Sequence, residues 1–315
     1  MITYIIRRLV MTVPILFGIS VVSFAIMMMA PGQPAIIDAD PTISPEAREA
    51  QIERLGLDDP LPVQYGRWLS NMVSGEFGNS YISGTPVSTL IAQRLPNTLI
   101  LMAASAFLAI LLAIPIGIIS AVRQYTKTDY TITLFSFAGV AIPNFWFGLL
   151  LIMFLSVQLG WFPVGGIQTI GGEASIMDRL HHLFLPALVL ATADMAGLTR
   201  YTRTSMLEVK SQDYIRTARA KGFKESRVIY KHALRNALLP LITIFGLMLP
   251  TFIGGSVVIE QIFSWPGIGQ LFMSSVFQRD YPVIMILTMF SAVLVVIGNL
   301  IADILYAIVD PRIEY

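Results

Sequence analysis

Residues 211–240 read SQDYIRTARAKGFKESRVIYKHALRNALLP, a polar and basic stretch between two long apolar segments. Ten of the 21 lysines and arginines fall between positions 200 and 235, where only three acidic residues accompany them. An excess of positive charge beside membrane spans indicates the cytoplasmic side of a membrane. The stretch therefore predicts a cytoplasmic loop between two spanning helices, and residues 200–237 are called the basic loop below.

The composition is typical of a protein that lies in lipid. Apolar residues make up 55% of the chain and charged residues 13%, and the mean hydropathy is +0.70. A soluble domain carries roughly 25% charged residues. The absence of cysteine excludes disulfides and cysteine metal sites, and three scattered histidines are too few for a convincing metal cluster. Composition thus predicts an integral membrane protein without a metal site.

Six apolar segments account for most of the chain. An uncharged run of 22 residues follows Arg7 and Arg8. It is longer than the apolar core of a signal peptide and predicts an uncleaved first helix. Positive charge alternates between the loops as expected for six spans with both termini in the cytoplasm. The sequence predicts an all-α integral membrane protein with six transmembrane helices over residues 9–30, 98–122, 130–159, 183–199, 238–263 and 283–309.

Residues 31–97 are expected to form a long extracytoplasmic segment. Eight acidic residues accompany four arginines there, which places it opposite the basic loop. Ser44 as N-cap, Pro45 in the first turn and Gly56 after the last turn predict a short helix. We therefore expect four parts, namely residues 1–30 with the first span, the segment 31–97, the core of spans 98–309 and a cytoplasmic tail 310–315.

Polar side chains inside the spans are candidates for function, because ionisable groups are costly in lipid. Asp194 lies in the fourth predicted span, and Asp303 shares a helix face with Asn299 in the sixth. Either aspartate could serve a proton-coupled secondary transporter, but their places near the cytoplasmic ends of the spans favour hydrogen bonds between helices. The fifth predicted span contains four helix-breaking residues, Pro240, Pro250, Gly254 and Gly255. They either kink the helix for packing or form a hinge that bends as a pathway opens.

The sequence contains no catalytic or nucleotide-binding motif. A phosphate-binding loop ends in Gly-Lys followed by Ser or Thr, and the pair Gly-Lys does not occur. There is also no Gly-x-Ser-x-Gly nucleophile elbow and no His-Glu-x-x-His zinc motif. Basic charge can indicate nucleic-acid binding, but membrane topology explains it more simply here. We expect no catalytic residue and no cofactor bound by this chain.

Within the basic loop, Asp213 can cap a short helix that Gly222 ends. Tyr214, Ile215 and Ala218 are expected to form an apolar knob on one face of that helix. The knob suits a groove on a soluble partner, and the amphipathic helix equally suits the surface of an anionic membrane. The pattern leaves both interpretations open.

Motifs along the whole chain resemble those of permease subunits of ATP-binding-cassette (ABC) importers, and more narrowly of the dipeptide/oligopeptide permease family. The basic loop carries DYIRTARAKG at 213–222 and HALRNALLP at 232–240. Importer permeases in general have Glu-Ala-Ala where this chain has Arg216-Thr217-Ala218, so no salt bridge of that glutamate carries over. The other matching stretches are Arg54–Asp58, Gly75–Ser80, Arg94–Thr98, Pro143–Trp146, Glu260–Gly269 and Asp310–Arg312.

The resemblance implies a type I ABC importer architecture, in which the long segment after the first helix marks the first of two permease subunits. The implied partners are a second permease, two cytoplasmic ATPase subunits that bind ATP and magnesium, and an extracytoplasmic substrate-binding protein. Similar permeases handle di- and oligopeptides, nickel chelates, glutathione or oligosaccharides. The implied location is the bacterial or archaeal cytoplasmic membrane.

The resemblance also implies roles for particular residues. The ATPases are expected to push on the helix of the basic loop through Asp213, Tyr214, Ile215, Ala218, Gly222 and Phe223. The stretch before the sixth span is expected to form an outer gate or a docking site for the binding protein, with Glu260, Phe263, Trp265, Pro266, Gly267 and Gly269.

Overall fold

The structure is a computed structural model that describes residues 2–29, 44–172, 175–238 and 256–309. These residues form helices and connecting loops and contain no strand, only one isolated bridge between Asn79 and Pro86. The expected hinge residues lie outside the described ranges, and so does the expected cytoplasmic tail; the hinge residues are Pro240, Pro250, Gly254 and Gly255.

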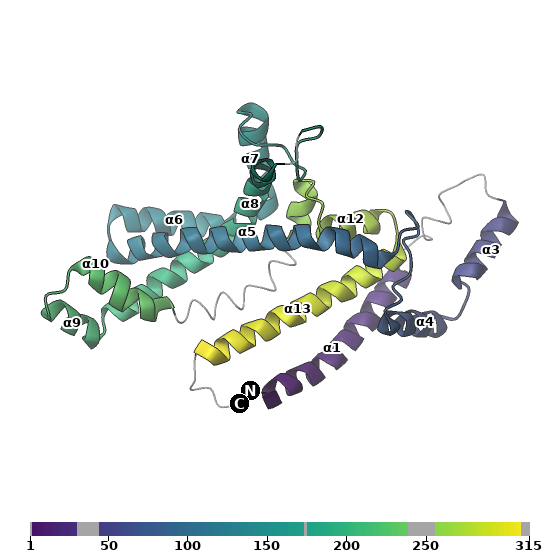
Figure 1. Cartoon of the computed structure of the whole chain (residues 1–315), viewed down its shortest axis with the longest axis horizontal. Coiled ribbons are helices and arrows are strands. Elements are labelled where there is room, and N and C mark those ends of the chain that lie inside the picture. The colour runs from purple at the N-terminus through teal and green to yellow at the C-terminus, as the bar shows by residue number, and fades with distance from the viewer. Residues whose placement is uncertain (1, 30–43, 173–174, 239–255, 310–315) are drawn as a thin grey trace. The chain divides into compact units, whose positions relative to one another are not determined.

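Figure 1 labels the helices, whose bounds follow. They are α1 (Ile2–Met29), α3 (Pro45–Leu55), α4 (Leu61–Ser74), α5 (Val87–Val122), α6 (Lys127–Ala141), α7 (Asn144–Leu151), the π-helix η1 (Ile152–Gln158), α8 (Ile176–Lys210), α9 (Asp213–Ala220), α10 (Glu225–Arg227), the π-helix η2 (Val228–Ala233), α12 (Ile268–Phe277) and α13 (Tyr281–Val309). Residues 234–238 and 256–262 are also helical.

Four of these helices contain segments long and apolar enough to cross a membrane. They are Ile6–Met29, Val87–Val122, Ile176–Lys210 and Tyr281–Ala302. A fifth span is possible if Lys127–Ala141 and Asn144–Gln158 act together, although the two halves bend by 104°. Most of the fifth predicted span lies outside the described ranges, so the total of six stays a prediction.

Pro143 explains the bend where one span over 130–159 was expected. Proline lacks the N–H that an α-helix needs, and it disfavours the helical conformation of the preceding residue. Ile142 accordingly has φ −83° and ψ 123°, an extended conformation, and α7 begins at Asn144. The third predicted span thus consists of two helices that meet at Pro143, and their crossing of the membrane as one span stays a prediction.

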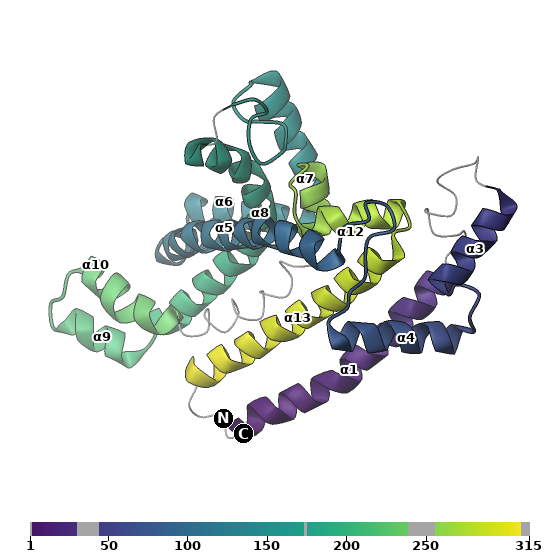
Figure 2. The ribbon, with the colours of Figure 1, turned by 45° about the vertical axis from the view of Figure 1, so that its right-hand side comes forward.

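One compact unit comprises Met1–Thr98 and Pro266–Val296, and we call it unit 1. Phe24 and Met27 of α1 pack with Met285 of α13, and Tyr65 of α4 joins this cluster. The Tyr65 hydroxyl also lies 2.8 Å from the hydroxyl of Ser20. Figure 2 shows α4 crossing α1. A second cluster joins the start of α5 to α12 and α13 through Val87, Ile91, Ile268, Val283, Ile286 and Leu287.

The predicted caps of the first external helix are confirmed. The Ser44 side chain accepts a hydrogen bond from the N–H of Ala47 at 3.2 Å, and Pro45 is the first residue of α3. Gly56 ends the helix with a φ of 64°, a left-handed conformation that costs glycine little. Local sequence thus determined both ends of α3.

The other compact unit comprises Leu99–Trp265 and Ile297–Tyr315, and we call it unit 2. Its long helix α8 packs against both α6 and α7. One cluster joins α8 to the segment before Trp265 through Leu185, Val189, Ile259 and Phe263. A second cluster, Ala109, Ala113, Ala191 and Leu198, brings α5 close to α8 through small side chains.

Gly117 lies where α5 closely approaches α8. A Cβ there would lie 2.5 Å from the Cβ of Thr202 and 2.8 Å from the carbonyl oxygen of Thr199. We expect Gly117→Ala to lower the free energy of unfolding by about 1–3 kcal/mol, because overpacking forces the helices apart. Gly197→Ala in α8 is the matched control, since its Cβ meets nothing within 4 Å. Thermal unfolding of both purified variants measures the effect, and equal stability of the two would contradict the prediction.

Candidate functional site: the basic loop and its attachment to the spans

The basic loop folds into a small helical lobe that follows α8 (Figures 1 and 2). α9 begins at Asp213, which is its first helical residue, while Gln212 occupies the cap position without a side-chain hydrogen bond. The expectation that Asp213 caps the helix was therefore wrong by one position. Its carboxylate still lies in the first turn, where negative charge is favourable.

Gly222 ends this helix as predicted. Its φ is 78°, and its N–H donates to the carbonyl of Arg219 at 2.9 Å. A residue with a Cβ costs roughly 1–2 kcal/mol in this left-handed conformation. The turn leads the chain through Phe223 into α10 and η2, which return toward α8.

The inner face of α9 is not open to solvent, because it packs against α5, α8 and η2 of its own unit. Ile215 is 0% exposed and Ala218 is 6% exposed. The cluster that buries them contains side chains of α5, α8 and η2, and we call it the loop core; its members are Ile118, Ala121, Met206, Ile215, Ala218, Val228, Ile229, Ala233 and Ala237. The expected knob is thus divided, because Tyr214 remains 43% exposed while Ile215 and Ala218 face inward.

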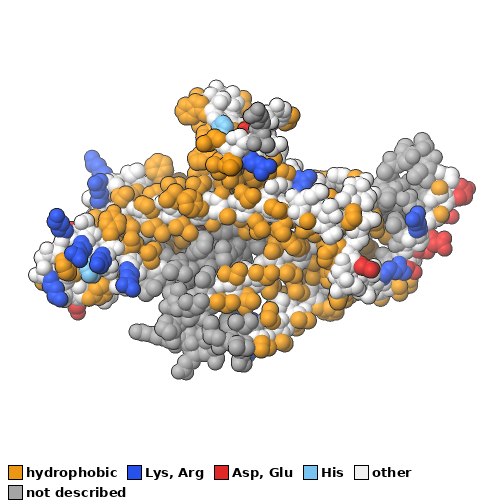
Figure 3. Space-filling model, in the orientation of Figure 1, with side chains coloured by type: hydrophobic (Ala, Val, Ile, Leu, Met, Phe, Trp, Pro, Cys, Tyr) orange, Lys and Arg blue, Asp and Glu red, His pale blue; other side chains and the backbone are white. Residues whose placement is uncertain are grey.

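The outer face of the lobe is basic, as Figure 3 shows where blue side chains gather over α9 and α10. Arg219 is paired with Glu225, at 3.1 and 2.8 Å. This guanidinium holds the pKa of the Glu225 carboxyl below its usual value. The pair closes the turn between α9 and α10, and other cations of the lobe remain exposed; among them are Lys221, Lys224, Lys231 and Arg235.

An open pocket of about 400 Å³ lies on the lobe and is lined by Tyr214, Lys231, His232, Arg235 and Asn236. The side-chain amide of Asn236 donates to the Tyr214 hydroxyl at 2.8 Å. Phe223 stacks on His232, with 5.6 Å between ring centroids, and the buried Nε2 of His232 has no hydrogen-bond partner among the described residues. Two cations and unused hydrogen-bonding capacity make this pocket suited to an anionic group.

Two polar contacts attach the lobe region to the spans. The ammonium of Lys210 donates to the carbonyl of Ala121 at 3.0 Å, which joins the last turns of α8 and α5. Earlier in α8, the Nε and Nη2 atoms of Arg203 donate to the two carboxylate oxygens of Asp129, at 2.8 and 2.9 Å. The same carboxylate accepts from Ser120 and from the N–H of Tyr125. Sequence reasoning missed this network.

The residues expected to form an outer gate or dock are largely enclosed. In unit 2, Glu260, Phe263 and Trp265 are 0%, 2% and 2% exposed. The Phe263 carbonyl also accepts from the N–H of Gly166 at 2.8 Å. These three side chains are therefore packed inside unit 2, and their role in an outer gate or dock stays a prediction.

The remaining three residues of that group belong to unit 1. The Pro266 carbonyl accepts from the Asn97 amide at 2.8 Å, and Gly267 precedes the first turn of α12. Thr98 accepts from the N–H of Ile268 at 2.8 Å, while Gly269 is buried within α12. These contacts tie the start of α12 to α5, and a gating role for them stays a prediction.

The polar residues predicted in the spans occupy α8 and α13. Asp194 is partly buried in α8, and its carboxylate makes no hydrogen bond or ion pair with any described residue. Asn299 is exposed on α13, and Asp303 is a helical residue of the same element. The expected hydrogen bond between helices is therefore not seen for Asp194 among the described residues, and the roles of Asn299 and Asp303 stay predictions.

Two family models together match nearly the whole chain. Residues 1–102 match the N-terminal part of a binding-protein-dependent transport system membrane component, and residues 113–315 match the binding-protein-dependent transport system inner membrane component. The chain belongs to this family. The permease is therefore the membrane subunit of an ABC importer, a multi-pass inner-membrane protein and not a catalytic enzyme.

Curated relatives extend over the full length of the permease. It is 67% identical to the oligopeptide transport system permease protein AppB of Bacillus subtilis, over 100% of both chains. It is 38% identical to the di/tripeptide transport system permease protein DppB of Pseudomonas aeruginosa, over 100% of this chain and 99% of the relative. The glutathione transport system permease protein GsiC of Escherichia coli K12 is 41% identical over 100% of both chains.

A solved structure supports the fold. An inward-facing structure of the MetNI methionine ABC transporter matches with a TM-score of 0.57 and 18% identity, over 71% of this chain and 98% of that chain. The predicted all-helical fold of an ABC importer permease is thus confirmed for the described residues.

Proposed function

We propose that the permease forms, with a second permease subunit, the membrane path for di- and oligopeptides delivered by an extracytoplasmic binding protein. The names of the AppB and DppB relatives support peptides as the substrate class, ahead of glutathione, nickel chelates or oligosaccharides. The proposed location is the cytoplasmic membrane of a bacterium or archaeon, with both termini and the basic loop in the cytoplasm.

The observation that carries this proposal is that α9 is anchored on its inner face and exposed on its outer face. A lone carrier has no need of a helix that is anchored by Ile215 in the loop core and presents a cationic outer face. Two cytoplasmic ATPase subunits, which bind ATP and magnesium that this chain does not bind, act on that face. An acidic group of the ATPase suits the pocket between Lys231 and Arg235. Displacement of α9 then moves the spans and opens the path to the outside.

Uptake by proteoliposomes tests this proposal. The permease is reconstituted with its second permease, ATPases and binding protein, and uptake of a labelled tripeptide is followed with vanadate or a proton uncoupler added separately. We expect vanadate to abolish ATP-driven uptake and the uncoupler to leave it unchanged. Uptake that survives vanadate and collapses with the uncoupler would instead support a proton-coupled carrier that uses Asp194 or Asp303.

A further inference from the structure

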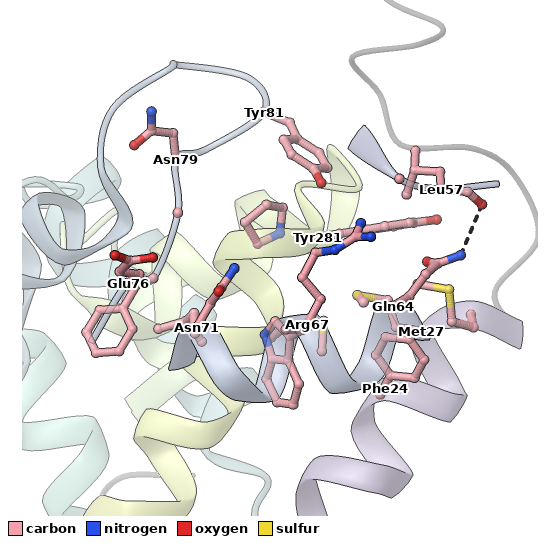
Figure 4. A pocket seen from close by; sticks show the side chains of 18 residues that line it. Phe24, Met27, Leu57, Gln64, Arg67, Asn71, Glu76, Asn79, Tyr81 and Tyr281 are labelled. Carbon is pink, nitrogen blue, oxygen red and sulfur yellow. Dashed lines mark hydrogen bonds between the residues drawn. The ribbon is translucent and has the colours of Figure 1, made fainter. Parts of the chain in front are cut away.

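A pocket of about 240 Å³ lies entirely within unit 1. The end of α1, the helix α4, the loop over residues 75–86 and the start of α13 form its walls (Figure 4). The loop over residues 75–86 contains the Gly75–Ser80 motif, to which neither the basic loop nor the proposed coupling assigns a role. The function of this pocket is therefore considered separately from that of the basic loop.

The 75–86 loop is held firmly in place. The buried carboxylate of Asp280 accepts from the Ser80 hydroxyl and, at 3.0 Å, from the N–H of Tyr81. Within the loop the N–H of Ser80 donates to Thr85 at 2.9 Å, and the N–H of Val87 donates to Gly78 at 3.0 Å. These bonds preorganise the rim of the pocket, so that a ligand need not order the loop on binding.

The polar groups on the two sides of the pocket differ in their hydrogen bonding. In Figure 4, Arg67 and Gln64 lie on one side, and both are already engaged. Arg67 pairs with Asp59 at 2.6 Å, and the Gln64 amide donates to two backbone carbonyls at 3.0 and 2.8 Å. The cationic charge at this side of the pocket is thus neutralised locally.

The opposite side carries groups that are not engaged. Glu76, Asn71 and Asn79 lie there in Figure 4, and their side chains make no hydrogen bond to any described residue. The buried indole N–H of Trp68, which also lines the pocket, has no partner among the described residues either. On this side of the pocket, one carboxylate and two amide oxygens are thus free to accept hydrogen bonds from an ammonium group, which has three donors and no acceptor.

Apart from Tyr81, Tyr281 and two glycines, the rest of the lining is apolar, and the pocket is small. Ligand pockets for drug-sized molecules measure about 300–1,000 Å³, so this pocket accommodates a single residue and not a whole oligopeptide. An apolar side chain attached to an ammonium group matches both parts of the lining. The apolar members are Phe24, Met27, Met28, Leu57, Phe77, Pro282, Met285 and Ile286.

We propose that this pocket binds the amino-terminal residue of a short peptide. Glu76 pairs with the α-ammonium group, the amides of Asn71 and Asn79 accept from it and bind the first peptide group, and the first side chain enters the apolar part. The inference deepens the proposed function and rests on it, because it gives a peptide importer a site on the permease that distinguishes a free amino terminus from a blocked one.

Photocrosslinking on the full chain in lipid nanodiscs tests the site. The probes are p-benzoylphenylalanyl-alanyl-alanine with a free amino terminus and the same peptide with an acetylated amino terminus, and mass spectrometry locates the label. We expect the free amine to label the segment over residues 67–81 about tenfold more than the acetylated probe, since the charge-assisted contact is lost on acetylation. Equal labelling by the two probes would overturn the proposal.

Variants at Glu76 identify the group that makes the contact. Glu76→Gln is expected to reduce labelling by the free amine about tenfold, and Glu76→Asp, which keeps the charge, to retain most of it. Glu49→Gln changes an exposed carboxylate of α3 that does not line the pocket, and it is the matched control with unchanged labelling. Wild-type labelling of a folded Glu76→Gln variant, as judged by its thermal unfolding, would also overturn the proposal.

The uptake assay separates this inference from the proposed function. If peptide uptake is sensitive to vanadate but the pocket is not labelled, the proposed peptide site is wrong while the proposed function in peptide import is supported. Absence of vanadate-sensitive peptide uptake removes the proposed function itself, and with it the foundation of this inference.

Discussion

Asp129→Ala is expected to lower the free energy of unfolding by about 3–5 kcal/mol. The Asp129 side chain is 3% exposed and accepts both guanidinium contacts of Arg203, which is itself only 27% exposed. Removing the carboxylate leaves the charge of Arg203 in a partly buried place without its partner. It also removes the acceptor for Ser120 and for the N–H of Tyr125. Thermal or denaturant unfolding of the purified chain measures the loss.

Asp213→Ala is the matched control for that experiment. Asp213 also pairs with an arginine, Arg216, but at 3.4 Å and with both side chains largely exposed. Exposed pairs contribute about 0–1 kcal/mol, so the control should remain close to wild type. The double variant Asp129→Ala, Arg203→Met should recover part of the loss, because it leaves no unpaired charge. A single variant as stable as the control would show that the pair is not buried in the membrane-embedded protein.

Ile215→Asp is expected to release α9 from the loop core. The substitution removes the burial of a side chain that is 0% exposed, which contributes about 1.5–3 kcal/mol, and adds an unpaired charge whose burial is costlier still. Arg216, Arg219 and Lys221 lie in or directly after α9. Trypsin should therefore cut this segment at least about tenfold faster than in wild type, since local opening exposes the backbone.

Thr217→Asp places the same charge on the exposed face of the same helix. It should leave the rate of tryptic cleavage near that of wild type, although it alters the charge of α9 equally. In the reconstituted transporter, Ile215→Asp should abolish vanadate-sensitive uptake, whereas Ile215→Val should retain it. Unchanged cleavage in Ile215→Asp would mean that the loop core does not hold α9.

Local sequence signals predicted the parts of the fold that depend on a few neighbouring residues. Ser44, Pro45 and Gly56 bound α3 as expected, and Gly222 ends α9. The same signals placed the cap of α9 one residue too late, because Gln212 has the extended conformation of a cap although its side chain makes no capping bond. Helix ends are decided by backbone conformation as well as by side-chain chemistry.

Contacts between distant segments could not be predicted in this way. Thr126-x-x-Asp129 is a capping signal, and Thr126 does cap α6. Nothing in that signal indicated that the Asp129 carboxylate binds Arg203, which lies 74 residues away. The same limit explains the expected knob of α9, of which Ile215 and Ala218 face inward. A short apolar pattern cannot tell whether a side chain faces its own chain or a partner.

The π-helix η2 has a consequence for how the lobe can move. A π-turn closes its hydrogen bonds over five residues instead of four, so it holds one residue more than the α-helix on either side of it. That spare residue allows η2 to tighten into an α-helix, which would rotate everything after it by about 100°, the angle of one residue in a helix. Lys231 and His232 lie within η2, and Arg235 follows it. A change of register by a single residue would therefore turn these side chains together and shift Ala237 within the loop core.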